Sequence, residues 1–412
     1  MNGKLNERFL PILLGSDINV YGMARSFHEE YGIVSEAHSA AFLSATKFSK
    51  IVNVFAHENF DEPETFIKVM RELKFKYKDD PRQLLIVPCG DGYTELVARY
   101  KKELSVDFIC PTVDYDLQQI LSNKVLFYET CEKYGLPYPK TMIITKDSFE
   151  KKQKIELSFD LPVALKPANS VEYLDVQFEG RKKAFILYSL EEVNDVLKKI
   201  YQAGYTSEMI CQNFIPGDDS RMRVLNAYVD QNHKVRMMCL GHPLLEDPTP
   251  QSVGNYVAIV PDYNEKIYRQ IKEFLEKIQY TGFANFDMKY DVRDGEYKLF
   301  EINLRQGRSS FYVTLGGYNL AKYLVEDYIL KLPFKETTYA KGNKLWIGVP
   351  KKILKKYIVS GPDKEKALNF IKKGDYGSTI NYKKDMSFKR FLLIQHMFYT
   401  YYDRYKKYFK KK

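Results

Sequence analysis

The segment Phe300-Glu-Ile-Asn-Leu-Arg-Gln-Gly-Arg-Ser-Ser310 decides how the rest of this sequence is interpreted. It has the character of a buried β-strand, yet polar side chains occupy every second position of its first half. Because side chains alternate along a strand, its two faces are Glu301, Asn303 and Arg305 on one side and Phe300, Ile302 and Leu304 on the other. The apolar face predicts an anchor in the core, and the polar face predicts the wall of a cleft.

A second strand is predicted just upstream. Its alternation places on one face the side chains Asn285, Asp287 and Lys289. A two-residue Asp-Gly turn between the strands would put Asp287 and Glu301 on different faces. A three-residue loop, 293–295, with Gly295 in the left-handed conformation instead sets the two acids directly opposite each other. We predict the three-residue loop.

Two opposed carboxylates repel each other unless something lies between them. A hard divalent cation held by Asp287, Glu301 and Asn303 removes this repulsion, because such ions prefer oxygen ligands. The alternative is that the acids simply pair with basic side chains of the same strands. The sequence favours a metal and phosphate site, since Arg305 and Arg308 follow immediately.

The composition is that of an ordinary globular protein. With 412 residues, 45% hydrophobic and 28% charged, the chain is long enough for roughly two to four packed units. No apolar run reaches the roughly 18 residues that cross a bilayer, and the stretch 9–14 is too short for a signal peptide, so we expect a cytoplasmic protein. The five cysteines form no CxxC pair and are expected to be reduced core residues.

The net charge of +10 is compatible with nucleic acid, anionic lipid or phosphorylated substrates as partners. Residues 401–412 carry six basic residues against one acidic residue. This tail predicts contact with a diphosphate group of a substrate or with an anionic membrane surface, and a solvated tail is the alternative. We expect no nucleic-acid partner, and the sequence leaves the oligomeric state open.

Strands and helices alternate first and then change pattern, which predicts an α/β and α+β fold. Residues 1–118 are expected to form a doubly wound N-terminal domain. Residues 119–205 are expected to form a small unit with a linker helix, and residues 206–334 a larger unit. Residues 335–412 are expected to be a basic extension rich in tyrosine and lysine.

The aspartate of one strand followed by Glu-x-Asn on the next resembles the closing signature of the ATP-grasp superfamily. The resemblance implies ATP as a substrate and two Mg²⁺ ions bound by Asp287, Glu301 and Asn303. It also implies that the doubly wound domain precedes a two-part ATP-grasp domain.

Other positions of the chain resemble the nucleotide site of this superfamily in the right order. The residues implied are Lys124 and Lys166 for the phosphates, Gln212, Asn213, Phe214 and Ile215 for adenine, and Asp219 for the ribose. Gln212 stands where a glutamate is usual. The loop over the phosphates, 168–180, lacks the usual glycines, so Ser170, Lys182 and Lys183 are only candidates there.

The implied chemistry joins a carboxylate to an amine, which requires ATP to activate the carboxylate first. Arg305 or Arg308 would hold an anionic group by a two-point fork. Arg236 is a further candidate for the transferred phosphoryl group, with a solvated strand residue as the alternative. His242 is a candidate proton acceptor for the amine, and the alternative is a structural histidine.

Longer stretches, such as 165–176 and 215–230, are similar to a narrower family of ligases in peptidoglycan precursor synthesis. The similarity implies that D-aspartate is attached through its β-carboxyl group to the lysine ε-amine of UDP-MurNAc-pentapeptide. A ligase for another amino acid and a non-catalytic ATP-binding protein are the alternatives. Local residues do not determine the enantiomer.

Three polar residues end predicted strands of the N-terminal domain, where open α/β sheets bind ligands. Ser16 and Asp17 follow the first strand, and Asp91 lies in Gly90-Asp-Gly92. They are assigned to the substrate other than ATP. Structural turns are the alternative.

Overall fold

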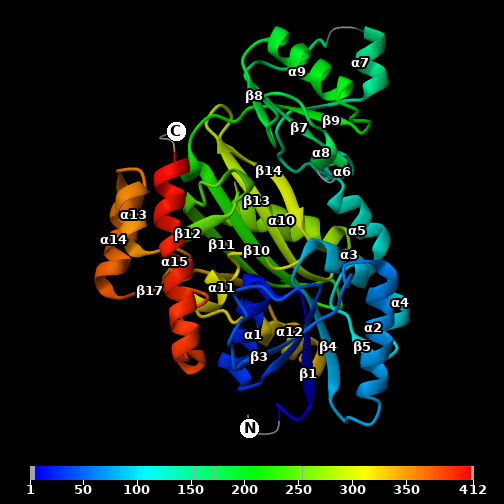
Figure 1. Cartoon of the computed structure of the whole chain (residues 1–412), viewed down its shortest axis with the longest axis vertical. Helices are drawn as coiled ribbons and strands as arrows, with labels where there is room; N and C mark the ends of the chain where they lie inside the picture. Colours follow the sequence, from blue (N-terminus) through cyan, green and yellow to red (C-terminus); the bar gives the residue numbers. More distant parts are fainter. Residues whose placement is uncertain (1–4, 153–154, 170–171, 253, 410–412) are drawn as a thin grey trace. The chain divides into compact units, whose positions relative to one another are not determined.

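The computed structural model describes residues 5–152, 155–169, 172–252 and 254–409 (Figure 1). The chain forms two compact units. The main unit comprises Met1–Gln119, Asp218–Asp287 and Ile302–Lys412, and the small unit comprises Ile120–Gly217 and Met288–Glu301.

A parallel sheet opens the main unit. Its strands are β1 (Phe9–Leu14), β2 (Ser35–Ser39), β3 (Val52–Ala56), β4 (Gln83–Pro88) and β5 (Phe108–Ile109), in the order β3-β2-β1-β4-β5. The helices of this region are α1 (Ile18–Tyr31), α2 (Pro63–Lys76), α3 (Asp91–Arg99), α4 (Lys101–Leu104) and α5 (Tyr115–Ser122). The order reverses between β1 and β4, so the predicted doubly wound architecture is confirmed.

A larger mixed sheet follows, in the order β14-β13-β10-β11-β12-β16-β17, with β15 paired to β11. Its strands are β10 (Met222–Val229), β11 (Val235–Glu246), β12 (Tyr256–Asp262), β13 (Gly282–Asp291), β14 (Glu296–Asn303), β15 (Thr338–Ala340), β16 (Leu345–Ile347) and β17 (Tyr376–Gly377). The helical segments around it are η2 (Asp219–Arg221), η3 (Pro250–Ser252), α10 (Glu265–Lys277), α11 (Phe311–Leu315), α12 (Leu320–Leu324) and the π-helix η4 (Val325–Ile329). β13 and β14 continue across the boundary into the small unit.

The small unit is built on an antiparallel sheet of order β6-β9-β7-β8. Its strands are β6 (Thr141–Ile144), β7 (Val163–Pro167), β8 (Phe185–Leu187) and β9 (Met209–Asn213), and its helices are α6 (Lys124–Tyr134), α7 (Lys146–Lys152), α8 (Glu172–Asp175) and α9 (Leu190–Gln202). Val193, Leu197 and Ile200 of α9 are buried in the core of this unit. β9 joins this sheet although it lies beyond residue 205; the predicted domain boundaries themselves stay predictions.

The C-terminal segment is part of the main unit rather than a loose extension. Beyond β15, β16 and β17 it forms α13 (Lys351–Tyr357), α14 (Pro362–Lys373), η5 (Lys383–Asp385) and the long α15 (Phe388–Tyr408). Tyr405 is 1% exposed and donates a hydrogen bond to the carbonyl of Glu246, and Arg404 pairs with Asp247 at 2.8 Å. The alternative of a merely solvated tail is therefore wrong for these residues. Among the described residues, no helix combines the length and apolar character needed to span a membrane.

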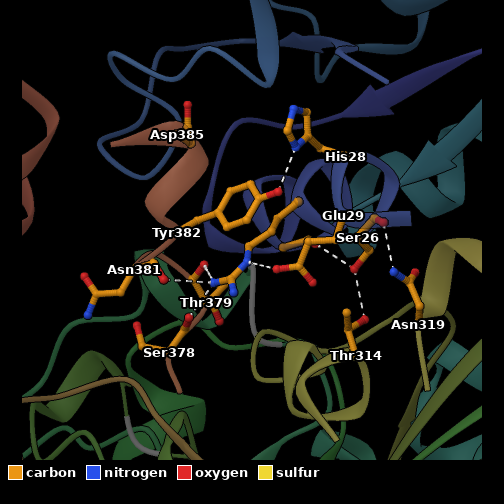
Figure 2. Close-up of polar contacts among 12 residues, drawn as sticks. Ser26, His28, Glu29, Thr314, Asn319, Ser378, Thr379, Asn381, Tyr382 and Asp385 are labelled. Carbon is orange, nitrogen blue, oxygen red and sulfur yellow. Dashed lines mark hydrogen bonds and ion pairs between the residues drawn. The ribbon is translucent and has the colours of Figure 1, made fainter. Parts of the chain in front are cut away.

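Arg25 of α1 ties the C-terminal segment to the N-terminal sheet of the same unit. Its guanidinium donates to the carbonyl oxygens of Ser378, at 2.7 Å, and Thr379, at 2.8 Å. Figure 2 shows the neighbouring contact, in which a ring nitrogen of His28 lies 2.8 Å from the hydroxyl of Tyr382. These contacts join residues more than 350 positions apart in the sequence.

A second anchor lies at Asp385, which is fully buried. Its carboxylate pairs with Arg390 at 3.1 Å and accepts hydrogen bonds from the hydroxyl groups of Tyr21, at 2.8 Å, and Ser49, at 2.9 Å. Arg390 in turn donates to the carbonyl of Ala45 at 3.0 Å. The two charges therefore face each other at close range and both groups have further hydrogen bonds, although Nε of Arg390 itself makes none with the described residues.

Candidate active site

The turn between β13 and β14 differs from the prediction in length. Gly295 has a φ of +74°, so the predicted left-handed conformation is confirmed. However, β13 ends at Asp291 and β14 begins at Glu296, so four residues, 292–295, separate the strands instead of three. The N–H of Gly295 donates to the carbonyl of Asp291 at 2.9 Å, which closes the longer turn. The direct opposition of Asp287 and Glu301 stays a prediction.

Polar side chains of β13 and β14 gather on one face in the main unit. The Asn303 amide nitrogen lies 3.2 Å from Oδ1 of Asn285 and 3.5 Å from Oδ2 of Asp287. The shared face expected from alternation is therefore confirmed for these three residues. Mg²⁺ prefers carboxylate and amide oxygens as ligands. The oxygen and nitrogen of an asparagine amide exchange places when the amide is flipped, so Asn303 can present its oxygen to the ion. The donor set therefore fits Mg²⁺.

Among the described residues, no dense cluster of carboxylate, histidine or cysteine side chains offers a competing metal centre. Within the part of the chain that the structure describes, no group of three or more His, Cys, Asp or Glu side chains is arranged to hold a metal ion. A magnesium site shared with phosphate needs fewer protein ligands than a dedicated cage.

Two half-buried lysines of the small unit lie close to each other. Lys166 lies on β7, and its ammonium is 3.3 Å from the hydroxyl of Tyr128 on α6. Burial, and next the charge of Lys124, lower the pKa of Lys166 to about 7, and the carboxylate of Glu301 opposes this shift. Burial also lowers the pKa of Lys124, again opposed by Glu301 and assisted by the charge of Lys183. The small unit thus brings together the two predicted phosphate lysines and one predicted metal ligand.

This group is held by the first turn of α6 and the neighbouring strand end. The Asn123 side chain caps α6 by accepting hydrogen bonds from the backbone of Val125, at 2.9 Å, and Leu126, at 3.2 Å, which fixes the helix at Lys124. Tyr128 donates to the carbonyl of Phe300 at 2.8 Å. The positions of the lysines follow from ordinary helix and strand geometry.

The predicted adenine segment lies at the end of β9. Gln212 is buried, and its amide nitrogen donates to the hydroxyl of Thr141 at 2.8 Å. The amide side chain is therefore held within the sheet. A glutamate here would accept from the same hydroxyl instead of donating to it.

Two backbone N–H groups of this segment already donate hydrogen bonds within the protein. The N–H of Asn213 donates to the carbonyl of Lys140 at 2.9 Å, and the N–H of Phe214 donates to the carbonyl of Pro162 at 3.0 Å. A nucleotide base would therefore meet carbonyl groups, or the backbone of Ile215, at this end of β9. Sequence reasoning did not reveal which backbone donors the strand pairing uses.

The nucleotide was also predicted to contact Ser170 and Asp219. Ser170 lies outside the described residues. Asp219 is the first residue of η2 in the main unit and lines a cavity of about 920 Å³. Lys289 of β13 donates to the carbonyl oxygens of Ile215, at 2.9 Å, and Gly217, at 2.6 Å, and so supports the chain next to the adenine segment.

The predicted substrate residues meet at the switch between β1 and β4 in the main unit. Asp17 caps α1 by accepting from the backbone N–H groups of Asn19, at 2.9 Å, and Val20, at 3.3 Å. Burial raises the pKa of Asp17, against the opposing effects of these N–H groups and then of Arg308 and Arg305. Ser16 is buried, and its hydroxyl donates to the carbonyl of Ala41.

Arg305 connects this switch to β14. Its guanidinium pairs with Asp91, the first residue of α3, at 2.9 Å and donates to the carbonyl of Gln306 at 3.0 Å. Arg308 is exposed and acts on Asp17 electrostatically. Two acids and two arginines thus converge at the ends of β1 and β4.

Two residues at this place were missed by sequence reasoning. Asn19 donates to the carbonyl of Cys89 at 2.9 Å, and the amide nitrogen of Gln306 lies 3.0 Å from the sulfur of Cys89. Their carbonyl oxygens, Oδ1 of Asn19 and Oε1 of Gln306, are buried and have no hydrogen-bond partner among the described residues. Their closeness in sequence to strand ends was the signal that could have found them.

Arg236 is committed to the core of the main unit. Its Nε pairs with Asp230 at 2.8 Å, and its Nη2 donates to the carbonyl of Leu332 at 2.7 Å. Arg236 is buried in this ion pair. Neither the predicted phosphoryl contact nor the alternative of a solvated strand residue fits this position.

His242 of β11 is also buried, next to η2. Its Nε2 lies 2.7 Å from the carbonyl of Ser220, and its Nδ1 lies 3.7 Å from a carboxylate oxygen of Asp363. Burial, and then the charge of Arg223, lower the pKa of His242 to about 4. The ring is therefore neutral at neutral pH, donates from Nε2 and keeps its acceptor at Nδ1.

Comparison with known proteins adds sequence relatives. No protein-family model matches the chain. The chain is 61% identical over 415 residues to a D-aspartate ligase of Enterococcus faecium, covering 99% of each chain. It is 23% identical to a carbamoyl-phosphate synthase of Methanobrevibacter smithii, over 62% of this chain and 67% of that protein.

Solved structures give the fold. An L-amino acid ligase from Bacillus licheniformis matches with a TM-score of 0.54 at 14% identity, over 77% of this chain and 73% of its own. An N5-carboxyaminoimidazole synthetase from Staphylococcus aureus, complexed with ADP, matches with a TM-score of 0.58 at 13% identity, over 82% and 81%. A biotin carboxylase domain from Hydrogenobacter thermophilus matches with a TM-score of 0.59 at 14% identity, over 82% and 73%. The predicted ATP-grasp fold is confirmed.

Proposed function

Because this chain belongs to the D-aspartate ligase family, we propose that it joins the β-carboxyl group of D-aspartate to the lysine ε-amine of UDP-MurNAc-pentapeptide in an ATP-dependent reaction. The observation that carries the proposal is the identity of 61% over 99% of both chains. A ligase for another amino acid on the same scaffold and a non-catalytic ATP-binding protein are the alternatives to be tested.

The reaction proceeds through an acyl phosphate. The β-carboxylate attacks the γ-phosphorus of ATP and ADP leaves, which converts a poor leaving group into phosphate. The amine nitrogen then attacks the carbonyl carbon, the carbon–oxygen bond to phosphate breaks, and the amine gives up a proton. The protein has to neutralise phosphate charge, align the reactants and exclude water.

Lys124 and Lys166 hold the phosphate groups. Their support is electrostatic, since the two half-buried lysines lie near each other and have Glu301 as a shared acidic neighbour. A polyphosphate chain supplies the negative charge that this arrangement lacks. Adenine lies against Gln212, Asn213, Phe214 and Ile215, and Asp219 receives the ribose.

Two Mg²⁺ ions are bound by Asp287, Glu301 and Asn303. When bound, they neutralise phosphate charge during the transfer. Glu301 and Asn303 stand two residues apart on β14 and share a face by strand alternation.

D-aspartate binds at the switch between β1 and β4. It carries two carboxylates and one ammonium group, and this site offers both kinds of partner. Arg305 and Arg308 hold a carboxylate by a fork of N–H groups, while Asp17 and Asp91 receive the ammonium group. Ser16 supports the loop through its bond to Ala41.

The location and surface contacts follow from the substrates. A nucleotide-linked precursor and ATP place the reaction in the cytoplasm. The basic C-terminal tail adds contact with an anionic membrane surface, where each Lys or Arg contributes about 1 kcal/mol.

One assay tests the proposal against its alternatives. The chain is supplied with ATP, Mg²⁺, UDP-MurNAc-pentapeptide and either D- or L-aspartate, and ADP and the product mass are measured. We expect product with D-aspartate only. Equal activity with both enantiomers contradicts the stereochemical claim, and no ADP under any condition supports the non-catalytic alternative.

A matched variant and an isotope test the mechanism. Glu301→Gln should lower turnover strongly and leave the melting temperature nearly unchanged, whereas a purely structural ion pair predicts the reverse. Oxygen-18 in the β-carboxylate should appear in the released phosphate, and its absence would reject the acyl phosphate.

A further inference from the structure

The cavity of about 920 Å³ lined by Asp219 lies wholly within the main unit. It is formed by η2, by the end of β11, and by residues 356–364 and 408–409 of the C-terminal segment. Its volume falls within the roughly 300–1,000 Å³ of pockets that bind small molecules. The C-terminal segment, which has no other role in the proposed reaction, therefore supplies much of the wall of a cavity large enough for a small molecule.

The charge of this cavity is opposite to that of the whole chain. Its lining carries four carboxylates and two ammonium groups, from Asp218, Asp219, Glu246, Asp363, Lys356 and Lys364. The chain as a whole has a net charge of +10. A cavity with this excess of carboxylates attracts a cation and disfavours an anion such as a phosphate group.

The two lysines of the lining are already engaged. Lys364 donates to the carbonyl of Ile358 at 3.1 Å, and the ammonium of Lys356 lies 5.1 Å from the ring centroid of Tyr357. Asp363 is 42% exposed at its side chain, so its carboxylate is accessible to a ligand. Asp218 and Glu246 also accept hydrogen bonds, from the N–H groups of Ser220 and Gly254. The negative excess of the lining therefore lies in its count of four carboxylates against two ammonium groups, with Asp363 the most clearly accessible of the acids.

Part of the remaining wall is apolar. It includes the side chains of Leu244, Leu245, Val359 and Pro362. Aliphatic walls bind methylene groups by removing them from water, at about 0.8 kcal/mol for each buried methylene. A chain of methylenes that ends in an ammonium group matches both features of the cavity.

His242 stands directly behind this wall. Ser220 and Asp363 both line the cavity, and both contact the ring, at 2.7 Å through Nε2 and 3.7 Å through Nδ1. His242, which was predicted to accept the proton of the amine, therefore lies next to Asp363, the carboxylate that would hold the ammonium group.

We infer that this cavity binds the acceptor, a peptide whose lysine side chain lies along the apolar wall with its ammonium group facing Asp363. The inference rests on the proposed function, which requires an amine-bearing acceptor, and it assigns the C-terminal segment to recognition of that acceptor.

The test separates acceptor binding from activation of the carboxylate. Asp363→Lys reverses the charge of the wall, and Val359→Trp fills the cavity. The matched controls are Asp403→Lys and Val34→Trp, at exposed positions outside the lining. For each variant, KM is measured with a lysine-bearing pentapeptide, and the acyl phosphate is trapped separately with hydroxylamine, which is too small to need the cavity.

We expect KM for the peptide to rise about tenfold or more in both cavity variants and to stay unchanged in both controls. Hydroxamate formation from ATP and D-aspartate should be unaffected in all four proteins. The same peptide with norleucine in place of lysine should compete poorly, because it keeps the methylenes and loses the charge.

Each failure has a distinct meaning. If the unsubstituted chain forms no hydroxamate, the proposed function fails. If hydroxamate forms but the cavity variants keep their KM for the peptide, or if the norleucine peptide competes as well as the lysine peptide, the inference is wrong. Melting temperatures of all variants show that a raised KM does not come from unfolding.

Discussion

Two charged groups in this chain, one buried and one half-buried, have opposite surroundings. In the main unit, Asp385 faces Arg390 at 3.1 Å and also accepts hydrogen bonds from Tyr21 and Ser49. In the small unit, Lys166 lies 3.3 Å from the neutral hydroxyl of Tyr128. The charge of a second lysine, Lys124, further disfavours the charged form of Lys166.

We propose that the difference separates a structural charge from a functional one. Removing two charges from water is costly, and the protein recovers that cost only when the partners are close and hydrogen-bonded. The Asp385 pair meets this condition with its own residues. Lys166 does not, and its lowered pKa shows that the protein alone disfavours its charged form. A site in that state is completed by a ligand of opposite charge.

The largest effect is expected from breaking the satisfied pair. Arg390→Met leaves the buried carboxylate of Asp385 without its counter-charge, which should lower the free energy of unfolding by about 3–5 kcal/mol. The exposed neighbour supplies a control, Lys389→Met, which should change it little. Denaturant titration measures both. Turnover per folded molecule should be unchanged in Arg390→Met, and a stable variant with lost turnover would reverse our assignment of the pair.

The opposite result is expected for the unsatisfied lysine. Lys166→Met should lower kcat by about 10²–10³-fold, as when one preorganised electrostatic contact is removed from a transition state. The melting temperature should stay equal or rise, because the variant no longer buries a poorly paired charge. Lys198→Met, at an exposed position of α9, is the control in the same unit. A fall in stability with normal turnover would show that Lys166 is structural.

A smaller effect is expected from pH. The pKa of Lys166 is lowered to about 7, so the free site is charged below this pH and loses its charge above it. Bound phosphate favours the charged form and raises the pKa, so binding takes up a proton above pH 7. ATP affinity should therefore be flat below pH 7 and weaken by up to about tenfold per pH unit above it.

Calorimetry in buffers of different ionisation enthalpy measures both the affinity and the proton uptake. Lys166→Met serves as the control for ionisation of the nucleotide itself, and its pH dependence should be reduced to that background. An unchanged pH profile in the variant would mean that another group takes up the proton.

Local periodicity accounts for what was predictable about the site. Alternation within each strand, together with the predicted register between them, placed Asn285, Asp287 and Asn303 on one face, because side-chain direction in a strand repeats every two residues. The left-handed conformation of Gly295 followed from glycine at a hairpin turn. The length of that turn did not, since three-residue and four-residue loops use similar residues.

Partners distant in sequence account for what was missed. Arg236 has alternating spacing typical of a strand, but its burial depends on Asp230 and on the carbonyl of Leu332, 96 positions away. Asn19 and Gln306 form a polar pair around Cys89 from three separate segments. No local sequence pattern predicts contacts between segments that lie far apart in the sequence.

By itself, the sequence of this protein determined the order of its elements, its ATP-grasp fold and the residue types available for metal and phosphate, because these depend on local periodicity and on motifs. The tertiary structure alone decided which charges are satisfied and which await a ligand. That distinction depends on distances between residues such as Asp385 and Tyr21, 364 positions apart, and on burial, neither of which is a property of any single stretch of the chain.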